Sequence, residues 1–357
     1  MDIKKIKIKM AAPNNLVIYM SSLCNRKCDY CYARKTIFKK AIEKKVLLGA
    51  VGKFLKSSAK DKKITFLGGE PFLHVDLIKA VLIFIRKENK DNLPVHVFTN
   101  GFLINKKISD LIKKFDVNLI ISINELSFVE GLSKSKNNIK KILKNIDIPR
   151  TAASIVIRKE SAHKLHENVL NLYKLGFRHI AWSPDITKIW NEKEILTLKR
   201  EMLKLRRHYF CLIKKGLELY EIANAYEIMD EILKRPFKEA CMSAVLCPDG
   251  SFIPCDKLIG ADKKSLKKYA SKQVSGGKKK ELFFQEALKY GAGVKRLMCP
   301  VGAFAFRKHV SADKSGDIKK AVKAHKKLSA AIEKNYLSLF EQALKYRVFR
   351  KVHNIDG

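Results

Sequence analysis

Short apolar runs alternate with longer amphipathic segments between about residues 15 and 185 of the 357-residue chain. The runs are apolar almost throughout, and the segments between them have the apolar spacing of a helix. Strands that are apolar on both faces and separated by helices belong to a parallel sheet that helices cover. Because such crossovers are right-handed, we predict an α/β fold with a partial (β/α)6 TIM-like barrel. The six predicted strands are 16–20, 63–67, 95–101, 117–124, 154–157 and 179–183.

Residues that could bind a cofactor or take part in catalysis follow four of these runs, each at the point where a strand is expected to end. Three cysteines follow the first run, and Gly-Gly-Glu-Pro (68–71) follows the second. Thr-Asn-Gly (99–101) follows the third, and Ser122 and Asn124 end the fourth. The carboxyl ends of parallel strands meet at one edge, where such folds carry their active sites. We therefore expect one site at that edge.

The three cysteines stand as Cys24-Asn-Arg-Lys-Cys28-Asp-Tyr-Cys31. The chain has 8 cysteines and no recognisable export signal, which favours metal binding over disulfides. A zinc site would need a fourth ligand, and no further His or Cys follows within about forty residues; His74 lies just beyond that window. A [4Fe–4S] cluster held by three thiolates leaves one iron open to an exogenous chelator.

This spacing, C-x3-C-x2-C with the aromatic Tyr30 before the last cysteine, resembles the signature of the radical S-adenosylmethionine (radical SAM) superfamily. The resemblance implies that Cys24, Cys28 and Cys31 bind a [4Fe–4S] cluster whose open iron binds SAM. It also implies that an electron from the cluster cleaves SAM to a 5′-deoxyadenosyl radical, which abstracts hydrogen from a substrate. In such enzymes the cofactor carries the chemistry, and the protein orients it.

The strand-end residues match other positions of the same family. Gly68, Gly69 and Glu70 would contact the methionyl amine of SAM, with Tyr30 also near the cofactor. Ser122 and Asn124 would reach the ribose hydroxyls, although Asn124 stands where the family commonly has Asp. From the residues alone, the glycines allow close backbone approach. By the resemblance, Thr99 and Asn100 would shape the same cleft and Trp182 and Ser183 would meet the adenine, but a turn or core role is equally open for all four.

A second cysteine group lies in the C-terminal half: Cys241, Cys247, Cys255 and Cys299. Gly250 and Cys255 form G-x4-C, and Cys241 lies one residue closer to Gly250 than in the opening of SPASM and twitch domains, which this segment resembles. The resemblance implies a shortened domain with one auxiliary [4Fe–4S] cluster, held by four thiolates or by three. Structural zinc and buried free thiols are the alternatives. Cys211, on a helical pattern, is expected to be a core thiol.

We predict four parts: a radical SAM core over 10–190, a helical connector over 191–235, an auxiliary-cluster domain over 236–305 and a helical extension over 306–357. The Lys-rich stretch 263–281 is expected to be a solvated loop or insertion. The segment 329–346 is amphipathic, and the stripe of Ile332, Tyr336 and Phe340 is expected to pack against the body of the protein.

The net charge is +38, with 73 Lys and Arg against 35 Asp and Glu. Nucleic-acid binding is possible on this charge, but the even spread of Lys favours a compositional bias. No apolar run approaches the roughly 18 residues of a membrane span, so we expect a cytoplasmic protein without a membrane partner.

The function that these features favour is a radical SAM enzyme acting on a peptide or protein, or else on a small molecule, with a reductant such as flavodoxin or ferredoxin. The alternatives are an RNA-modifying radical SAM enzyme and a non-enzymatic Fe–S or zinc scaffold. No catalytic acid or base can be assigned; Asp185 and Asp256 are candidates by location only.

Overall fold

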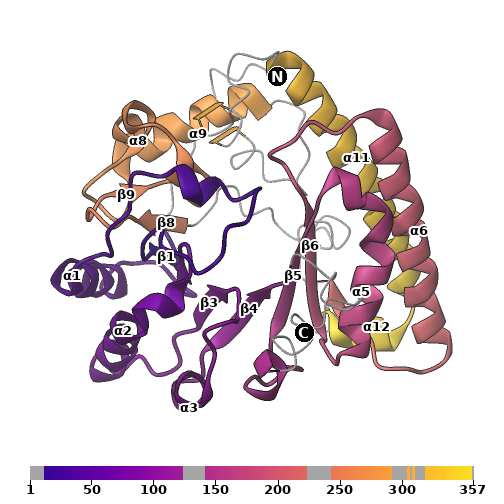
Figure 1. Ribbon diagram of the computed structural model, residues 1–357, viewed down its shortest axis with the longest axis horizontal. Coiled ribbons are helices and arrows are strands. Elements are labelled where there is room, and N and C mark those ends of the chain that lie inside the picture. Colours follow the sequence, from indigo (N-terminus) through magenta and orange to yellow (C-terminus); the bar gives the residue numbers. More distant parts are fainter. Residues whose placement is uncertain are drawn as a thin grey trace. The chain divides into compact units, whose positions relative to one another are not determined.

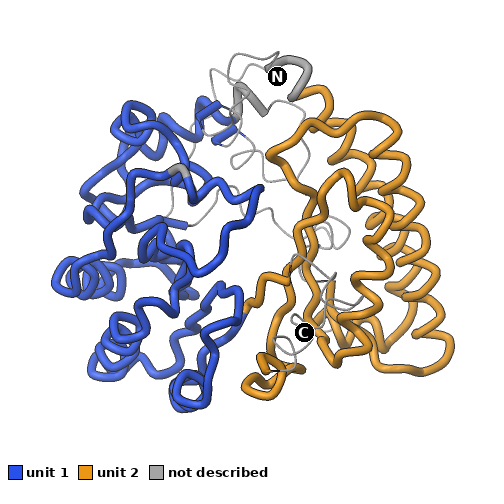
Figure 2. Tube along the Cα trace, viewed as in Figure 1, with its two compact units in different colours: residues 1–119, 238–292, 300–318 blue, residues 120–237, 293–299, 319–357 orange. Residues whose placement is uncertain are grey.

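The computed structural model describes residues 12–123, 141–222, 243–291, 304–305, 308–309 and 318–355, the side chains of Lys35, 288–291 and 318–321 excepted. The chain divides into two compact units (Figure 2). Unit 1 comprises Met1–Leu119, Lys238–Ala292 and Pro300–Ile318, and unit 2 comprises Ile120–Phe237, Gly293–Cys299 and Lys319–Gly357. The predicted domain boundaries stay predictions, because a compact unit is not the same as an independently folding domain.

The sheet of unit 1 has the strand order β3-β2-β1-β8-β9. β1 pairs in parallel with both β2 and β8, β2 pairs in parallel with β3, and only β9 runs antiparallel to its neighbour. The sheet thus joins the first three strands of the chain to a strand from the second cysteine region. The strands are β1 (Asn15–Tyr19), β2 (Lys63–Leu67), β3 (Val95–Thr99), β8 (Ser243–Leu246) and β9 (Phe252–Ile253).

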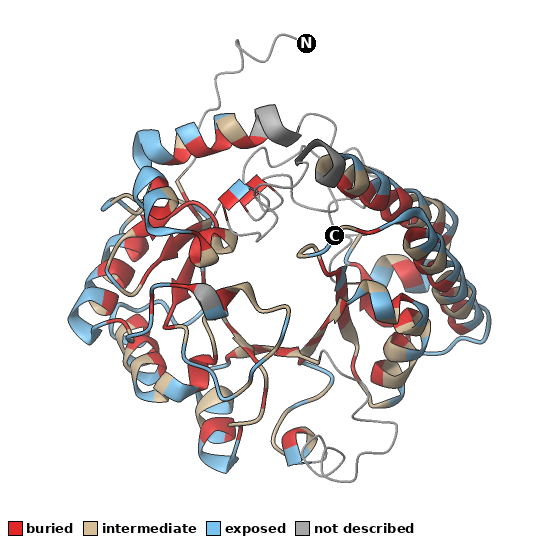
Figure 3. Ribbon diagram, turned by 45° about the horizontal axis from the view of Figure 1, so that its top comes forward, coloured by how far each residue is buried: buried red, intermediate tan, exposed pale blue. Residues whose placement is uncertain are grey.

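Helices cover this sheet, and their exposed residues lie on the side away from the strands (Figures 1 and 3). α2 shows why: Ile78, Val81, Leu82 and Ile85 are buried at helical spacing, while Lys79 and Ile83 on the other side are exposed. The α-helices of unit 1 are α1 (Lys44–Leu55), α2 (Val75–Lys87), α3 (Lys106–Lys114), α8 (Lys263–Tyr269) and α9 (Gly277–Gly291). Short 3-10 helices are η2 (Tyr32–Lys35), η3 (Pro71–His74) and η6 (Asp256–Gly260).

Unit 2 contains a second run of parallel strands, in which β5 pairs with β4 and β6, and β6 pairs with β7. The stripe predicted on the tail is confirmed, because Ile332, Tyr336 and Phe340 are all buried in the unit's core. The elements are β4 (Asn118–Ser122), β5 (Ala152–Ile157), η5 (Lys159–Lys164), α5 (Leu165–Lys174), β6 (His179–Pro184), α6 (Glu192–Lys214), β7 (Glu221–Ile222), α11 (Ile318–Ala343) and α12 (Arg347–Val352).

All six predicted strands are present at or within a few residues of their predicted positions. Gly176, just after α5, has φ +98°, the left-handed conformation in which glycine commonly ends a helix. In each unit the described strands form an open sheet rather than a closed one. No helix within the described residues combines the length and the apolarity that crossing a bilayer requires.

Two sequence-based expectations are wrong. The Lys-rich stretch 263–281 is largely helical, because Leu266, Tyr269 and the residue pair 283–284 lie on apolar faces that are buried beneath the lysines. Cys211 is exposed rather than buried. Its helix, α6, buries positions 209, 212 and 213, and position 211 lies on the opposite face.

Candidate cofactor site

The three-cysteine segment is a loop that leaves the carboxyl end of β1 in unit 1. Cys24 is exposed, and Cys28 and Cys31 are half-buried. The Cys31 backbone N–H donates to the Cys28 carbonyl at 3.2 Å, which closes a tight turn, and η2 begins directly afterwards. Tyr30 is half-buried within this turn. The predicted ligands therefore share one short, largely accessible loop.

Gly68 and Gly69 hold this loop against the end of β2. The Gly69 N–H donates to the Ser21 carbonyl, and the Glu70 N–H donates to the Leu23 carbonyl, both at 2.8 Å. A Cβ atom on Gly69 would lie 2.1 Å from the Leu23 oxygen, and one on Gly68 would lie 2.8 Å from the Ser21 oxygen. The glycines permit a close backbone approach, and the partner that the structure supplies is the cysteine loop's own backbone. Their contact with SAM stays a prediction.

Glu70 lies beneath this contact with 1% of its surface exposed. Its Oε1 accepts from the Phe72 N–H at 3.1 Å and the Thr99 hydroxyl at 2.8 Å, and its Oε2 accepts from the Asn100 N–H at 2.8 Å. Burial raises the pKa of this carboxyl, and the three hydrogen bonds counteract part of that rise. The side chain thus joins the ends of β2 and β3.

Asn100 connects the same corner to the cysteines. Its Nδ2 donates to Asn25 Oδ1 at 2.8 Å and lies 3.7 Å from Cys24 Sγ. The Arg26 N–H also donates to Cys24 Sγ, at 3.4 Å. Sequence reasoning placed Asn100 near the cleft but missed Asn25, whose only signal was its position between two cysteines.

The thiols have the donor chemistry of an iron–sulfur cluster. Burial raises the pKa of both Cys24 and Cys31, so ligand binding at neutral pH would involve loss of their protons to the metal. Among the described residues, no three His, Cys, Asp or Glu side chains converge closely enough to hold a single metal ion. A cluster spreads its thiolates over separate iron atoms, whereas zinc ligands meet at one atom.

The second cysteine group is partly described. Cys247 follows β8 and Cys255 follows β9, and both are buried. A tight turn connects these strands: Gly250 has φ +80°, and its N–H donates to the Cys247 carbonyl at 2.9 Å. Cys241 and Cys299 lie outside the described residues, as does Asn124.

A partly buried polar cluster joins the two cysteine segments. The Tyr32 hydroxyl, next to Cys31, donates to Asp256 Oδ2 at 3.0 Å, and the Lys257 ammonium donates to the same oxygen at 2.9 Å. Burial acts to raise the pKa of Asp256, but Lys257 and Tyr32 outweigh it, and the pKa is lowered. A carboxylate held ionised in this way is a poor proton acceptor, which weakens the case for Asp256 as a catalytic base.

The remaining predicted residues belong to unit 2. Ser122 ends β4 and is half-buried, and Ser183 is exposed. Asp185 is buried, and its Oδ1 accepts from the Thr187 N–H at 2.8 Å, so it serves as a turn cap. Trp182 is 3% exposed and packs against Tyr336 with ring centroids 6.2 Å apart.

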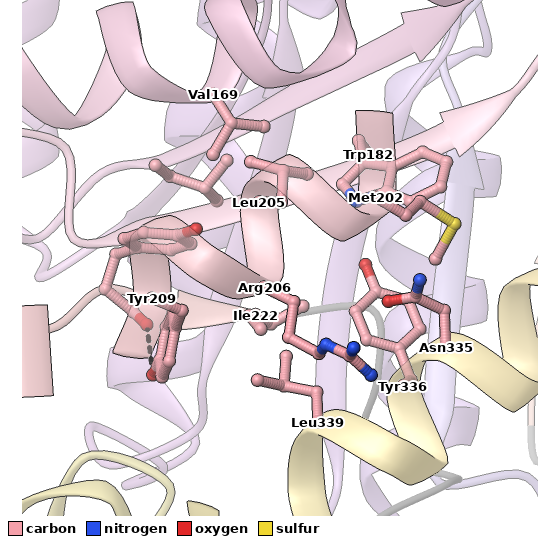
Figure 4. Close-up of a pocket in the computed structure, with 12 residues that line it drawn as sticks. Val169, Trp182, Met202, Leu205, Arg206, Tyr209, Ile222, Asn335, Tyr336 and Leu339 are labelled. Atoms are coloured by element: carbon pink, nitrogen blue, oxygen red, sulfur yellow. Dashed lines mark hydrogen bonds between the residues drawn. The ribbon is translucent and has the colours of Figure 1, made fainter. Parts of the chain in front are cut away.

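Figure 4 shows that Trp182 lines a small, mostly apolar cavity between α6 and α11. Its free volume is about 20 Å³, room for roughly one water molecule. The cavity is therefore packing space within the core, and Trp182 has the core role that the sequence left open.

With this geometry in place, residues 18–169 match the Radical SAM superfamily. Residues 18–169 are a radical SAM domain. The cysteine loop, the Gly-Gly-Glu corner and strands β2 to β5 all fall inside the matched region, which begins within β1.

Two relatives illustrate the similarity in sequence. An uncharacterized protein of Methanocaldococcus jannaschii is 31% identical over 194 residues, which cover 52% of this chain and 66% of the relative. The radical SAM cyclopropyl synthase TigE of Paramaledivibacter caminithermalis is 26% identical over 148 residues, which cover 37% of this chain and 31% of TigE. The matches therefore span less than two thirds of either relative.

Two solved structures share the fold. Native anSMEcpe with bound AdoMet, which is SAM, and a Cp18Cys peptide aligns with a TM-score of 0.65 at 18% identity, over 96% of this chain and 99% of that chain. Streptococcus suis SuiB bound to the precursor peptide SuiA aligns with a TM-score of 0.51 at 18% identity, over 75% of this chain and 67% of that chain. The predicted α/β class with a partial, unclosed barrel is confirmed.

Proposed function

We propose that the protein cleaves SAM reductively and uses the resulting 5′-deoxyadenosyl radical to abstract hydrogen from a peptide or protein. The carrying observation is the corner at which the cysteine loop is hydrogen-bonded to Gly69 and Glu70. It unites the two motifs that the chemistry needs, a three-thiolate cluster loop and a strand end next to it. When bound at Cys24, Cys28 and Cys31, a [4Fe–4S] cluster supplies one electron and an open iron for SAM.

The chain's own residues have positioning roles in this proposal. Asn100 and the Arg26 N–H lie against Cys24 Sγ and would hold that ligand in one orientation. Glu70 fixes Asn100 through its backbone N–H. Contacts with SAM are proposed for the residues predicted from the sequence, namely Tyr30, Gly68, Gly69, Glu70, Ser122 and Asn124.

We further propose one auxiliary [4Fe–4S] cluster at Cys241, Cys247, Cys255 and Cys299. Support comes from the hairpin of β8 and β9, which places two of these thiols in one buried cluster with Tyr32 and Cys31 packed against it. Burial raises the pKa of Cys247, and metal ligation is the ordinary way in which a buried thiolate is compensated. A four-thiolate zinc site is the competing outcome.

The substrate class rests on the structural neighbours, two of which hold peptides: anSMEcpe with Cp18Cys and SuiB with SuiA. Their low identity to this chain supports a shared fold, and the peptide substrate is carried over from them as a proposal. A flavodoxin or ferredoxin would supply the electron.

The proposal is tested by anaerobic reconstitution with iron and sulfide, followed by dithionite and SAM. Wild-type protein is expected to bind about eight irons and to form 5′-deoxyadenosine. Replacing Cys24, Cys28 and Cys31 together with Ala should abolish 5′-deoxyadenosine and leave about four irons. Cys211→Ala is the matched control, because that thiol is exposed and lies outside unit 1.

Iron near zero and no 5′-deoxyadenosine in the wild-type protein would refute the cluster assignment. Retention of zinc rather than iron in the triple variant would show that the second cysteine group holds zinc and not an auxiliary cluster. The peptide substrate is tested separately, by adding peptides encoded beside the gene and measuring a substrate-dependent rise in 5′-deoxyadenosine with a mass change in the peptide. Turnover of RNA in place of any peptide would contradict that part.

A further inference from the structure

Tyr19 is the last residue of β1 and is 1% exposed. Its hydroxyl is buried and makes no hydrogen bond to any described residue. A buried hydroxyl without a partner is costly, and such groups are rare in native proteins. The contrast with Tyr209 in unit 2 is clear, since the equally buried Tyr209 hydroxyl donates to the Tyr220 carbonyl at 2.9 Å.

The surroundings of Tyr19 are rich in sulfur. It belongs to a core cluster with Cys247 and Cys255, and Cys31 and Tyr32 pack against the same cluster. The Phe38 ring centroid lies 6.3 Å away. The side-chain polar groups of this cluster and of the residues packed against it include the cysteine sulfurs and the Tyr32 hydroxyl, which already donates to Asp256.

A phenol ordinarily titrates at a pKa of about 10 and is therefore protonated at neutral pH, so the Tyr19 hydroxyl is available as a donor. A neutral O–H beside a protonated thiol gains little, whereas beside a metal-bound thiolate it gains a charge-assisted hydrogen bond.

Resting on the radical SAM function proposed above, we propose that Tyr19 donates a hydrogen bond to the Cys31 thiolate of the loaded cluster and raises that cluster's reduction potential. Cys31 is favoured over Cys247 because it belongs to the loop that leaves β1, the strand that Tyr19 ends. It is favoured over Cys24 of the same loop because Cys24 is exposed, whereas Cys31 packs against the core cluster that contains Tyr19. A donor to a ligand sulfur stabilises the reduced cluster, which carries the extra negative charge. The unpaired hydroxyl would thus be a partner held ready for the metal-bound state.

The test compares wild-type protein with Tyr19→Phe, which removes only the hydroxyl. In an EPR-monitored redox titration without SAM, we expect the midpoint potential of the cluster at Cys24, Cys28 and Cys31 to become more negative. A change of roughly tenfold in the reduction equilibrium corresponds to about 59 mV for one electron. In the metal-free protein, the urea midpoint of Tyr19→Phe should equal or exceed that of the wild type, because an unpaired buried hydroxyl is lost.

Tyr209→Phe is the matched control: it should lower the urea midpoint, because its hydroxyl has a partner, and leave the potential unchanged. An unchanged potential in Tyr19→Phe would overturn the inference, as would a clear loss of stability in the metal-free protein. When Tyr19→Phe is combined with Ala at the three loop cysteines, only the proposed second cluster can form. A shift in midpoint potential that is confined to that second cluster would also overturn the inference. If instead the wild-type protein forms no cluster or no 5′-deoxyadenosine, the proposed function itself has failed.

Discussion

The most direct consequence of the site's geometry concerns Gly69. In Gly69→Ala the new methyl group would lie 2.1 Å from the Leu23 carbonyl oxygen, 2.5 Å from the Leu23 carbonyl carbon and 2.7 Å from the Ser22 oxygen. All three are backbone atoms, so no side-chain rotation can relieve the overlap. The loop must move away from β2, which weakens the hydrogen bonds that Gly69 and Glu70 donate to it.

Overpacking of this kind costs about 1–3 kcal/mol, and each weakened buried hydrogen bond adds about 1 kcal/mol. We therefore expect Gly69→Ala to lower the free energy of unfolding by about 3–5 kcal/mol in urea titrations of the metal-free protein. We also expect it to reduce the iron bound on reconstitution, because the cysteine loop is displaced.

Gly49→Ala is the control for this variant. Gly49 lies inside α1, and a Cβ atom there would meet nothing within 4 Å. Replacing a helical glycine by alanine stabilises by about 0.5–1 kcal/mol, so this variant should raise the free energy of unfolding and keep its iron. If Gly69→Ala unfolds at the same urea concentration as Gly49→Ala and binds iron normally, the argument that these glycines fix the loop is wrong.

Three further outcomes are expected. Glu70→Gln replaces Oε2 or Oε1 by an NH2 group facing a donor, either the Asn100 N–H or the Thr99 hydroxyl. It should lower the free energy of unfolding in urea by about 1–3 kcal/mol, and an unchanged free energy would contradict the assigned hydrogen bonds. Burial lowers the pKa of His353 to about 4, so the unfolded state binds a proton at higher pH than the folded state does. The free energy of unfolding should therefore fall by about 2 kcal/mol between pH 7 and pH 5. Urea titrations at several pH values should show a smaller fall in His353→Gln, and an equal fall would assign the effect to other groups. Cys211→Ser should change the free energy of unfolding by no more than about 0.5 kcal/mol, and a larger loss would mean that this thiol is packed in the core after all.

The strands could be predicted from sequence because their signal is local. The run 63–67 is rich in residues that favour strands and lies between lysines and glycines, and the structure has a strand with those same ends. α2 was equally clear, since its apolar residues repeat at helical spacing over its whole length. Segments whose own pattern determines their environment need no knowledge of the rest of the chain.

The dense run of lysines led to a wrong structural prediction. The lysines of 263–281 suggested a solvated loop, but Lys280 is 2% exposed and its ammonium donates to the Ser243 carbonyl at 3.1 Å. A long side chain can bury its stem and still satisfy its charge. The Tyr32–Asp256 contact was beyond sequence reasoning for another reason, because it joins residues 224 positions apart and depends on β8 pairing with β1.

The two motifs that identified the family are not independent signals once the structure is known. Gly69 and Glu70 make backbone hydrogen bonds to the segment just before Cys24, and the Glu70 carboxylate holds the backbone of Asn100, whose side chain reaches Cys24 from the other side. A buried carboxylate with three donors resists displacement, since each lost donor would leave it charged and underpaired. The loop's first cysteine is thereby tied to the ends of β2 and β3 before any metal binds. This argues that the Gly-Gly-Glu corner acts first by fixing the cluster loop, and that any contact it makes with SAM is added to that role.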